Sequence, residues 1–575
     1  MAGWWERDPG RWASEQQALE QARIRYEREP VADLMRLKLE LELDGQRHRL
    51  IAHFPSDYPS FPPAVAAPDL ALVRHQTPGS KMLCLLRRGG DEWQPGTDTL
   101  AGLLLSQLPH VFASQPGNEA IAGDHEAHEG VPITGYITFD PGSFVGFPAY
   151  AFAALTPTGT FRAVLESVRP LRGTVFQVLD SHGQVIASAD ATAGPTFEER
   201  GLPIVTGRWI RLGTRPEMLD AKAYYALAAA EVPSLERPSW QALPGGTGAR
   251  VDLVALLFQD ELAWQGWGGN VILVSKSHEP KAASEAQRKV LTRVNRAELE
   301  SQQHYFVRDP AASGLQQGIV CQIGAGSVGS PAAKLMAQAG LGRLRLIDHD
   351  VLDAGNAIRW ELGRGAAGYS KVQVLQSHLS QHFPYCRVGI AHARLGDASM
   401  AGTPEERQIQ DLMFRDVSCL LDTSASVRVA HFLSEQARRR GIPYLWAHAT
   451  NGAWGGLVGY AGPNQEDFCW ECHLHYLNET QGPVPPLAAA PEAEFVQPAG
   501  CMDPTFVGAQ ADLMEVSLMG ARATLDAVLH RVGAHAQRAH RWNLATLRLR
   551  DDHGRPQLPV WTPHTLAPHA ACPNH

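Results

Sequence analysis

The sequence predicts three folded blocks: an α+β block over residues 1–120, a mixed α/β block over 131–300 and an α/β doubly wound block over 301–575. A chain of 575 residues has room for about three or four domains. In the last block, short apolar runs alternate with helix-like segments, which is typical of a mostly parallel sheet covered by helices. The small, polar and acidic stretch 116–130 is a predicted linker.

The composition argues against several classes of protein. The formal net charge is −9, so no basic surface suggests a nucleic-acid partner. The first residues lack the basic and apolar regions of a signal peptide, and no apolar run approaches the roughly 18 residues of a membrane span. Eight cysteines are too few for a disulfide scaffold in so long a chain. We therefore expect a cytoplasmic protein without a membrane partner, whose cysteines bind metal or react as thiols.

In the first block, a helix over 10–27 should precede a hairpin of two strands, and a second helix over 99–111 should close the block. The hairpin strands are expected at 34–43 and 48–53, joined around Asp44-Gly45. The middle block shows strand-like pieces and one helix, but no catalytic constellation, so a docking or spacer role is favoured there. Its expected elements are strands at 174–179, 185–188, 209–212 and 271–274 and a helix at 221–230.

In the last block, a glycine loop joins a strand to a helix. Gly324, Gly326 and Gly329 would let the backbone turn tightly, approach phosphates and pack helix against strand. Asp348 ends the following strand, where a carboxylate can bind ribose hydroxyls. A glycine loop alone is weak evidence, and a dehydrogenase would show the same features. The expected strands are 319–323, 344–348, 419–422 and 443–447, and the expected helices are 330–339, 371–382, 426–440 and 512–528.

Polar residues after the glycine loop follow a recognisable order. They are Asp348, Asp350, Asn356, Arg359, Lys371 and Asp422. Over about residues 315–530 this order resembles the adenylating family of ubiquitin-activating enzymes and ThiF/MoeB-type sulfur-carrier activators. The resemblance implies a Rossmann-like domain that binds ATP and joins a carboxylate to its α-phosphate. It also implies that Arg359 and Lys371 bind the phosphates and that Asp422 binds Mg²⁺. The chain departs from the family pattern at Gly355, Ile358 and Trp360.

Four residues have the spacing of a structural zinc site. Cys469 and Cys472 form a C-x-x-C pair, and Cys572 and His575 form a C-x-x-H pair at the end of the sequence. Three thiolates and an imidazole suit tetrahedral Zn²⁺. A redox C-x-x-C is the rival interpretation, but its position late in the fold does not fit a thioredoxin-like active site.

One further cysteine, Cys501, precedes the last long helix. It resembles the cysteine with which some ThiF/MoeB-type enzymes take the activated carboxylate as a thioester. The alternative is a small buried apolar residue. Three other cysteines lie in apolar surroundings and are expected in the core: Cys321, Cys386 and Cys419.

The first block carries a second ordered set of residues. It consists of Tyr58-Pro59, Pro62-Pro63, His75, Cys84-Leu85 and Trp93-Gln94-Pro95. Over about residues 10–112 this order resembles ubiquitin-conjugating enzymes, and the resemblance implies that Cys84 carries a thioester. The family's His-Pro-Asn is replaced by His75-Gln76-Thr77, so Gln76, Thr77 or another donor would have to steady the oxyanion. An inactive binding module is the alternative, but such modules typically lack the cysteine.

Together the resemblances imply a bacterial fusion of activating and conjugating enzymes, as in antiphage operons. The activated partner would be a ubiquitin-like protein or a cGAS-like nucleotidyltransferase, with transfer from Cys501 to Cys84 and then to an amine. The cofactors would be ATP, Mg²⁺ and Zn²⁺. A homodimer is also implied, with Arg308 as a candidate for completing the partner's ATP site. The rival interpretations are a sulfur-carrier adenylyltransferase with an inactive appended domain and a non-catalytic adaptor for ubiquitin-like folds.

Overall fold

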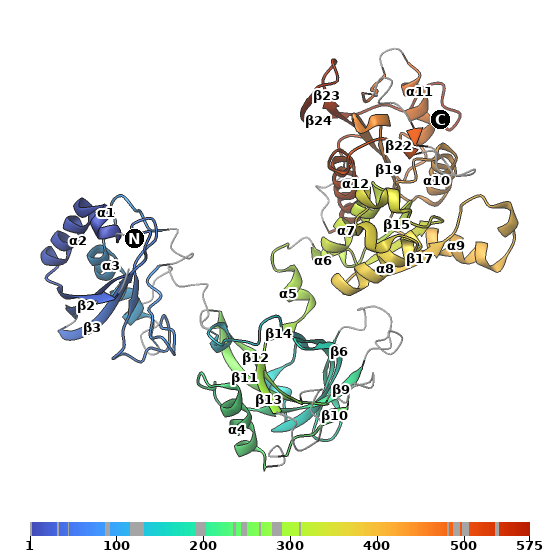
Figure 1. Ribbon diagram of the computed structural model, residues 1–575. Coiled ribbons are helices and arrows are strands. Elements are labelled where there is room, and N and C mark those ends of the chain that lie inside the picture. The colour runs from blue at the N-terminus through green and yellow to red at the C-terminus, as the bar shows by residue number, and fades with distance from the viewer. Residues whose placement is uncertain are drawn as a thin grey trace. The chain divides into compact units, whose positions relative to one another are not determined.

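A computed structural model of the chain (Figure 1) describes fifteen segments. These are residues 3–31, 34–43, 45–86, 92–115, 132–189, 203–233, 237–242, 250–263, 266–278, 290–309, 312–479, 482–486, 495–496, 505–534 and 540–575. The chain divides into two compact units. One unit comprises Met1–Ala189 and Leu202–Glu300, and the other contains Ser301–His575. The predicted boundary between the first two blocks lies among residues 116–131, outside the described segments, and stays a prediction.

The first block is a four-stranded antiparallel sheet with two main helices. Helix α2 ends earlier than predicted, because Arg25–Val31 pairs as a strand with Leu34–Leu43. The hairpin at Gly45 is confirmed, and the predicted closing helix is observed with Thr99 as its N-cap. The helices pack apolar side chains on one face of the sheet. The elements are α1 (Trp4–Arg7), α2 (Pro9–Gln21), β1 (Arg25–Val31), β2 (Leu34–Leu43), β3 (Gln46–Phe54), β4 (Ala64–Ala66) and α3 (Leu100–Ala113).

The middle block has more strand than the sequence predicts. Its ten strands belong to one sheet, and α4 is its one α-helix among the described residues. The longest strand, β11, has side chains buried on both faces between Val251 and Phe258, so it lacks the alternation that marks a strand in sequence. The elements are β5 (Phe144–Pro148), β6 (Thr158–Val168), β7 (Leu171–Asp180), β8 (Val185–Ser188), β9 (Ile204–Arg211), α4 (Ala221–Glu231), β10 (Gln241–Ala242), β11 (Arg250–Ala263), β12 (Gly266–His278), β13 (Val290–Asn295) and β14 (Ala297–Glu300).

The second unit confirms the doubly wound prediction and extends it. Its main elements are β15 (Ile319–Ile323), α7 (Gly329–Gln338), β16 (Arg343–Asp348), α8 (Lys371–His382), β17 (Arg387–His392), α9 (Pro404–Phe414), β18 (Cys419–Asp422), α10 (Val427–Arg440), β19 (Tyr444–Ala449), β20 (Gly455–Ala461), α11 (Trp470–Leu477), α12 (Gln510–Arg531), β23 (Leu544–Arg550) and β24 (Pro556–His564). The sheet order is β17-β16-β15-β18-β19-β20-β23-β24. The pairs from β17 to β19 are parallel, and the pairs from β19 to β24 are antiparallel. The short elements are α5 (Gln302–Phe306), α6 (Ala312–Leu315), β21 (Phe495–Val496) and β22 (Thr505–Phe506).

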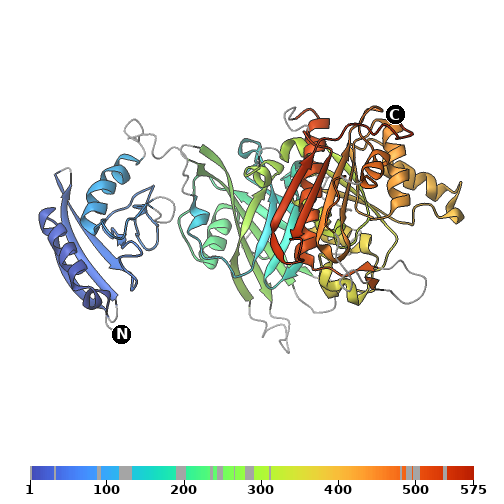
Figure 2. The ribbon, with the colours of Figure 1, turned by 90° about the horizontal axis from the view of Figure 1, so that it is seen from above.

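Alternate residues of the parallel strands feed two separate cores, one on each face of this sheet. Val320 of β15 packs in the core formed with α7, α8 and α12, whereas its neighbour Cys321 packs in the core formed with α9, α10 and α11. The period of two that defines a strand therefore explains why helices are needed on both faces. Figures 1 and 2 show these helices around the sheet. No helix among the described residues is long and apolar enough to span a membrane.

Candidate active site and metal centre

The glycine loop after β15 lies against the end of β18 with no room for extra atoms. Gly324 has a φ of +93°, and a Cβ there would lie 2.7 Å from the Ser424 nitrogen. A Cβ at Gly329 would lie 2.2 Å from the Gly324 carbonyl oxygen. Both positions therefore require glycine for backbone packing. A Cβ at Gly326 would meet no atom within 4 Å, so the space above this residue is open to a ligand.

Hydrogen bonds fix the loop to the neighbouring strands. The Ala325 amide donates to Asp348 Oδ2 at 2.6 Å, and the Asp350 amide donates to Asp348 Oδ1 at 2.7 Å. On the other side, Thr423 Oγ1 donates to the Gly324 carbonyl at 2.7 Å. The indole of Trp360, one of the departures from the family pattern, donates to the Ala325 carbonyl at 2.7 Å. Asp348 therefore shapes the loop, and each of its oxygens keeps a free lone pair for a ribose hydroxyl.

The two predicted phosphate-binding cations, Arg359 and Lys371, come from the segments that follow β16, which ends at Asp348. Lys371 begins α8 and forms an ion pair with Asp350, with 2.8 Å between Nζ and Oδ2. Burial opposes ionisation of Asp350, but the hydrogen bond and charge of Lys371 outweigh it, so the pKa of Asp350 is lowered. Arg359 ends a 3₁₀ turn and donates to Asn356 Oδ1 at 3.4 Å. Burial lowers the pKa of Arg359, which nevertheless stays charged at neutral pH.

The predicted magnesium ligand lies at the carboxyl end of β18. Asp422 is 0% exposed, and its Oδ1 accepts hydrogen bonds from the Ser424 amide at 2.8 Å and the Ser424 hydroxyl at 2.7 Å. Its Oδ2 accepts from the Tyr444 hydroxyl at 3.0 Å. Rotation of the Ser424 hydroxyl would free one acceptor position on Oδ1 for a hard cation. Its assignment as a Mg²⁺ ligand stays a prediction.

The strand order explains why these residues converge. Strand β15 pairs with β16 on one side and with β18 on the other, and the chain reaches them in opposite directions across the sheet. Such a topological switch point opens a crevice at the carboxyl ends of the strands, where ligands of doubly wound sheets bind. The glycine loop follows the carboxyl end of β15, and Asp348 and Asp422 are the last residues of β16 and β18. Sequence reasoning missed Thr423 and Ser424, since their role depends on this contact between non-consecutive strands.

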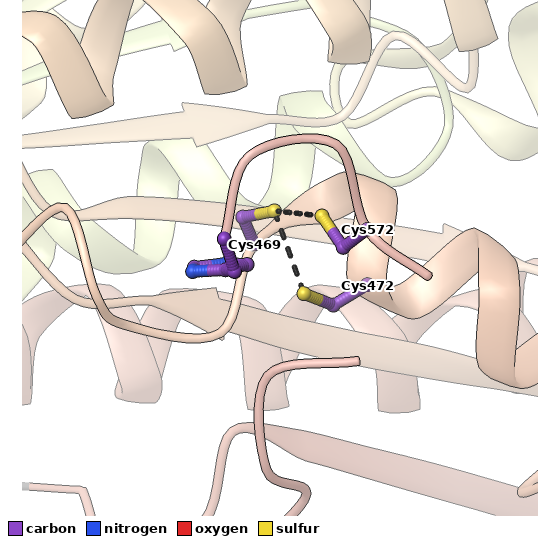
Figure 3. Close-up of side chains that lie close together, drawn as sticks. Cys469, Cys472 and Cys572 are labelled. Carbon is purple, nitrogen blue, oxygen red and sulfur yellow. Dashed lines mark hydrogen bonds between the residues drawn. The ribbon is translucent and has the colours of Figure 1, made fainter. Parts of the chain in front are cut away.

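A second site joins the start of α11 to the end of the chain (Figure 3). The ligand atoms of Cys469, Cys472, Cys572 and His575 all lie within 4.8 Å of one another. The Cys469 sulfur is 3.7 Å from that of Cys472 and 3.6 Å from that of Cys572. These separations are too long for disulfides, whose S–S bond is about 2.05 Å. They match the edge of a zinc tetrahedron, because a Zn–S bond of about 2.3 Å gives sulfur separations of about 3.8 Å.

The surroundings of these thiols also suit a metal. The three sulfurs belong to buried residues, and burial raises the pKa of Cys572 to about 12, so a bound cation would have to stabilise its thiolate. The His569 amide donates to the Cys472 sulfur at 3.3 Å, a contact that supports a metal-bound thiolate. The residues therefore fit the predicted Zn²⁺, with His575 as the more exposed fourth ligand.

The remaining cysteines divide as the sequence predicts or lie outside the described segments. Cys321, Cys386 and Cys419 are buried in the cores of the second unit, and burial raises the pKa of each thiol. Cys84 is exposed. Cys501 lies outside the described residues, so its exposure and role stay predictions.

In the first block, the loop that carries Cys84 is tied to the segment that contains His75. The Cys84 amide donates to the His75 carbonyl at 2.8 Å, and His75 has a φ of +60°. Gln76, one of the suggested oxyanion donors, is 2% exposed. Its carboxamide accepts from the Leu72 amide and donates to the Ala67 carbonyl, both at 2.9 Å. Gln76 therefore stabilises the loop. Because both ends of its carboxamide are already hydrogen-bonded there, it is not available to stabilise an oxyanion.

Comparison with known proteins assigns the C-terminal block. Residues 301–532 match the profile of the ThiF family. This block is a ThiF-type domain. A shorter likeness supports the match: the probable adenylyltransferase/sulfurtransferase MoeZ of Mycobacterium tuberculosis is 26% identical over 147 residues, which cover 25% of this chain and 35% of MoeZ. A crystal structure of E. coli MccB covers 48% of this chain and 73% of its own, with 13% identity and a TM-score of 0.34.

Two further relatives are proteins of Sinorhizobium fredii. The uncharacterized protein y4oA of Sinorhizobium fredii is 29% identical over 616 residues, which cover 99% of this chain and 97% of y4oA. The uncharacterized protein y4qC of the same species is 32% identical over 276 residues, covering 46% of this chain and 45% of y4qC. The match to y4oA includes all three blocks of the chain.

We predict about one equivalent of zinc per purified chain, measured by elemental analysis. Replacing Cys572 with alanine should abolish zinc binding and lower the melting temperature of the ThiF-type domain by roughly 5 °C or more. The control is His553→Ala, which changes a histidine in a surface turn of the same domain and should retain the metal. A Cys572→Ala protein with a full equivalent of zinc would show that other ligands hold it.

Proposed function

We propose that the chain activates the carboxyl terminus of a protein by adenylation in its ThiF-type domain. The observation that carries this proposal is the convergence of the glycine loop, Asp348, Lys371 and Asp422 at the switch point of the sheet. Open space above Gly326, with cations nearby, suits a nucleoside triphosphate.

The chemistry requires two bond exchanges. A carboxylate oxygen of the partner attacks the α-phosphorus of ATP, the bond from that phosphorus to the bridging oxygen breaks, and pyrophosphate leaves. A thiolate then attacks the acyl carbon of the adenylate, and AMP leaves with the electron pair of the broken C–O bond. The thioester retains enough reactivity for a later amine to form an amide.

The residues around the glycine loop have distinct proposed roles. The loop amides and the start of α7 would bind phosphate oxygens, and Asp348 would orient the ribose. Lys371 would leave Asp350 to bind the phosphates, and Arg359 would stabilise the charge that develops on the leaving pyrophosphate. Asp422 would hold Mg²⁺, which when bound neutralises phosphate charge.

The thiol steps involve the first block. Cys501 would take the acyl group from the adenylate, and the Cys84 thiolate would then attack this thioester and release the Cys501 thiolate. Exposure of Cys84 supports this proposal over a non-catalytic adaptor. The activated partner would be a ubiquitin-like protein or a cGAS-like nucleotidyltransferase. The expectation of an antiviral role gains no support from the named relatives.

The proposal also includes an oligomeric state and a second candidate function. A homodimer, with Arg308 reaching the partner's ATP site, would follow the family pattern. A sulfur-carrier adenylyltransferase is the second candidate, favoured by the likeness to MoeZ, a probable adenylyltransferase/sulfurtransferase. The two candidates share adenylation and differ in the use of Cys84.

We predict that the chain exchanges labelled pyrophosphate into ATP when its partner protein is present. Asp422→Asn keeps the size of the side chain but removes its charge, and should lower the exchange rate at least ~100-fold. Asp411→Asn is the matched control, since Asp411 is an exposed aspartate of α9, and should exchange at the wild-type rate. Full exchange by Asp422→Asn would exclude an essential charge at this position.

We also predict two successive thioesters. Cys84→Ala should leave a thiol-sensitive acyl adduct on Cys501 and stop ligation to an amine, whereas Cys501→Ala should keep pyrophosphate exchange but not load Cys84. Intact-mass spectrometry with and without reductant measures both adducts. Mixing the two variants tests transfer between chains, which would restore ligation. Normal loading of Cys84 in Cys501→Ala protein would contradict the relay.

A further inference from the structure

A buried ion pair connects the Cys84 region of the first block to the middle block. Arg74 Nε lies 2.9 Å from Glu261 Oε2, and the Arg74 Nη2 atom lies 2.8 Å from Glu261 Oε1. The two side chains are 5% and 3% exposed. Arg74 Nη1 also donates to the Ser114 carbonyl at 2.9 Å, at the end of α3. Such a bidentate pair fixes both the distance and the orientation of its partners.

Arg74 is one residue from the segment that contacts Cys84. Its own backbone is fixed by the Gln115 carboxamide, which accepts from the Arg74 amide at 3.4 Å and donates to the Arg74 carbonyl at 3.1 Å. The next residue, His75, has a positive φ, and its carbonyl accepts the Cys84 amide at 2.8 Å. A shift of the Arg74 guanidinium would therefore move the backbone of Arg74 and His75, and with it the hydrogen bond from the Cys84 amide to the His75 carbonyl.

Glu261 lies near the end of β11, beside a buried polar network. It precedes an irregularity in the pairing of β11 with β12, between Glu261 and Ala263. The adjacent Asp260 is 0% exposed, and its Oδ2 accepts from the Ile133 amide at 2.8 Å and from Asn270 Nδ2 at 3.0 Å. Glu261 is thus held by a satisfied polar network on one side and by Arg74 on the other.

Two further contacts lie along the same loop. A Cβ at Gly79 would be 2.9 Å from Met218 Cε of the middle block, so Met218 packs directly on the loop that leads to Cys84. Burial, followed by the nearby charge of Cys84, raises the pKa of Tyr136 to about 12. The loop from residue 74 to residue 84 therefore contacts the middle block at Arg74 and at Gly79.

We propose that Glu261 is a positioning residue for the Cys84 thiol: its buried ion pair with Arg74 holds the His75 carbonyl against the Cys84 amide and so orients the thiol for acyl transfer. The middle block then acts as a support for the conjugating site. The thioester part of this inference rests on the proposed function, but the position and reactivity of the thiol do not.

The test measures the reactivity of Cys84 in full-length protein. Iodoacetamide alkylates the protein without ATP or partner, and mass spectrometry of the Cys84 peptide gives the rate between pH 6 and 10. Glu261→Gln should raise the rate at least about threefold, because a released loop exposes the thiol more fully. Acyl transfer from the activated partner to Cys84 should fall at least about tenfold, because orientation is lost. Glu298→Gln, an exposed glutamate of β14, is the control and should change neither rate.

Loss of one member of a buried ion pair can also unfold a protein, so a second variant is needed. The reversed pair Arg74→Glu with Glu261→Arg restores opposite charges, and should return both rates to within about threefold of wild type. The inference is overturned if Glu261→Gln alkylates at the wild-type rate. A folded reversed pair that remains as altered as the single variant overturns it equally. Wild-type protein that never loads Cys84 would instead contradict the proposed function, while the alkylation result would still decide the role of Glu261.

Discussion

The contact between the glycine loop and the end of β18 is the constraint on which the second unit depends. Gly324 can lie against Thr423 and Ser424 because it has no Cβ, and the Thr423 hydroxyl completes the contact with a hydrogen bond. The parallel pairing of β15 with β18 places Asp422 opposite Ile323, beside a loop that lies about 100 residues earlier in the chain. A side chain at position 324 would force the glycine loop away from the Thr423–Ser424 turn, and the loop would then not face the same ligand as Asp422.

The ends of the ThiF-type domain are tied together by a different kind of interaction. The Cys469–Cys472 pair begins α11, whereas Cys572 and His575 lie at the end of the sequence. A metal bound by all four residues would close a loop of roughly 100 residues and would favour the folded state through its binding free energy. Because these residues pack beside α10 and α11, the metal centre supports the face of the sheet that carries Trp446 and Tyr444. Tyr444 in turn holds Asp422.

Local patterns predicted the parts of the chain that follow local rules. Helix α8 and strands β2, β8 and β18 have the predicted bounds, since capping residues, glycine turns and apolar runs mark their ends. The prediction failed where strand pairing determines the secondary structure. Residues 25–27 continue a helical pattern in the sequence but belong to β1, because they pair with β2. The ligands of the metal centre could be predicted from their spacing, because C-x-x-C and C-x-x-H pairs have few other roles. The roles of Thr423 and Trp360 and the ion pair of Arg74 with Glu261 could not be predicted, because each acts through a neighbour that is distant in sequence.

The central claim is that the crevice at the switch point binds ATP, and hydrogen–deuterium exchange with and without Mg²⁺ and ATP tests it most directly. Nucleotide should slow exchange at least about tenfold in peptides that cover the glycine loop and the Thr423–Ser424 turn, because their amides would be covered by phosphate. Peptides from β2 and β3 of the first block should exchange at unchanged rates. Equal exchange of the glycine-loop peptides in both states, or protection confined to another block, would contradict the account.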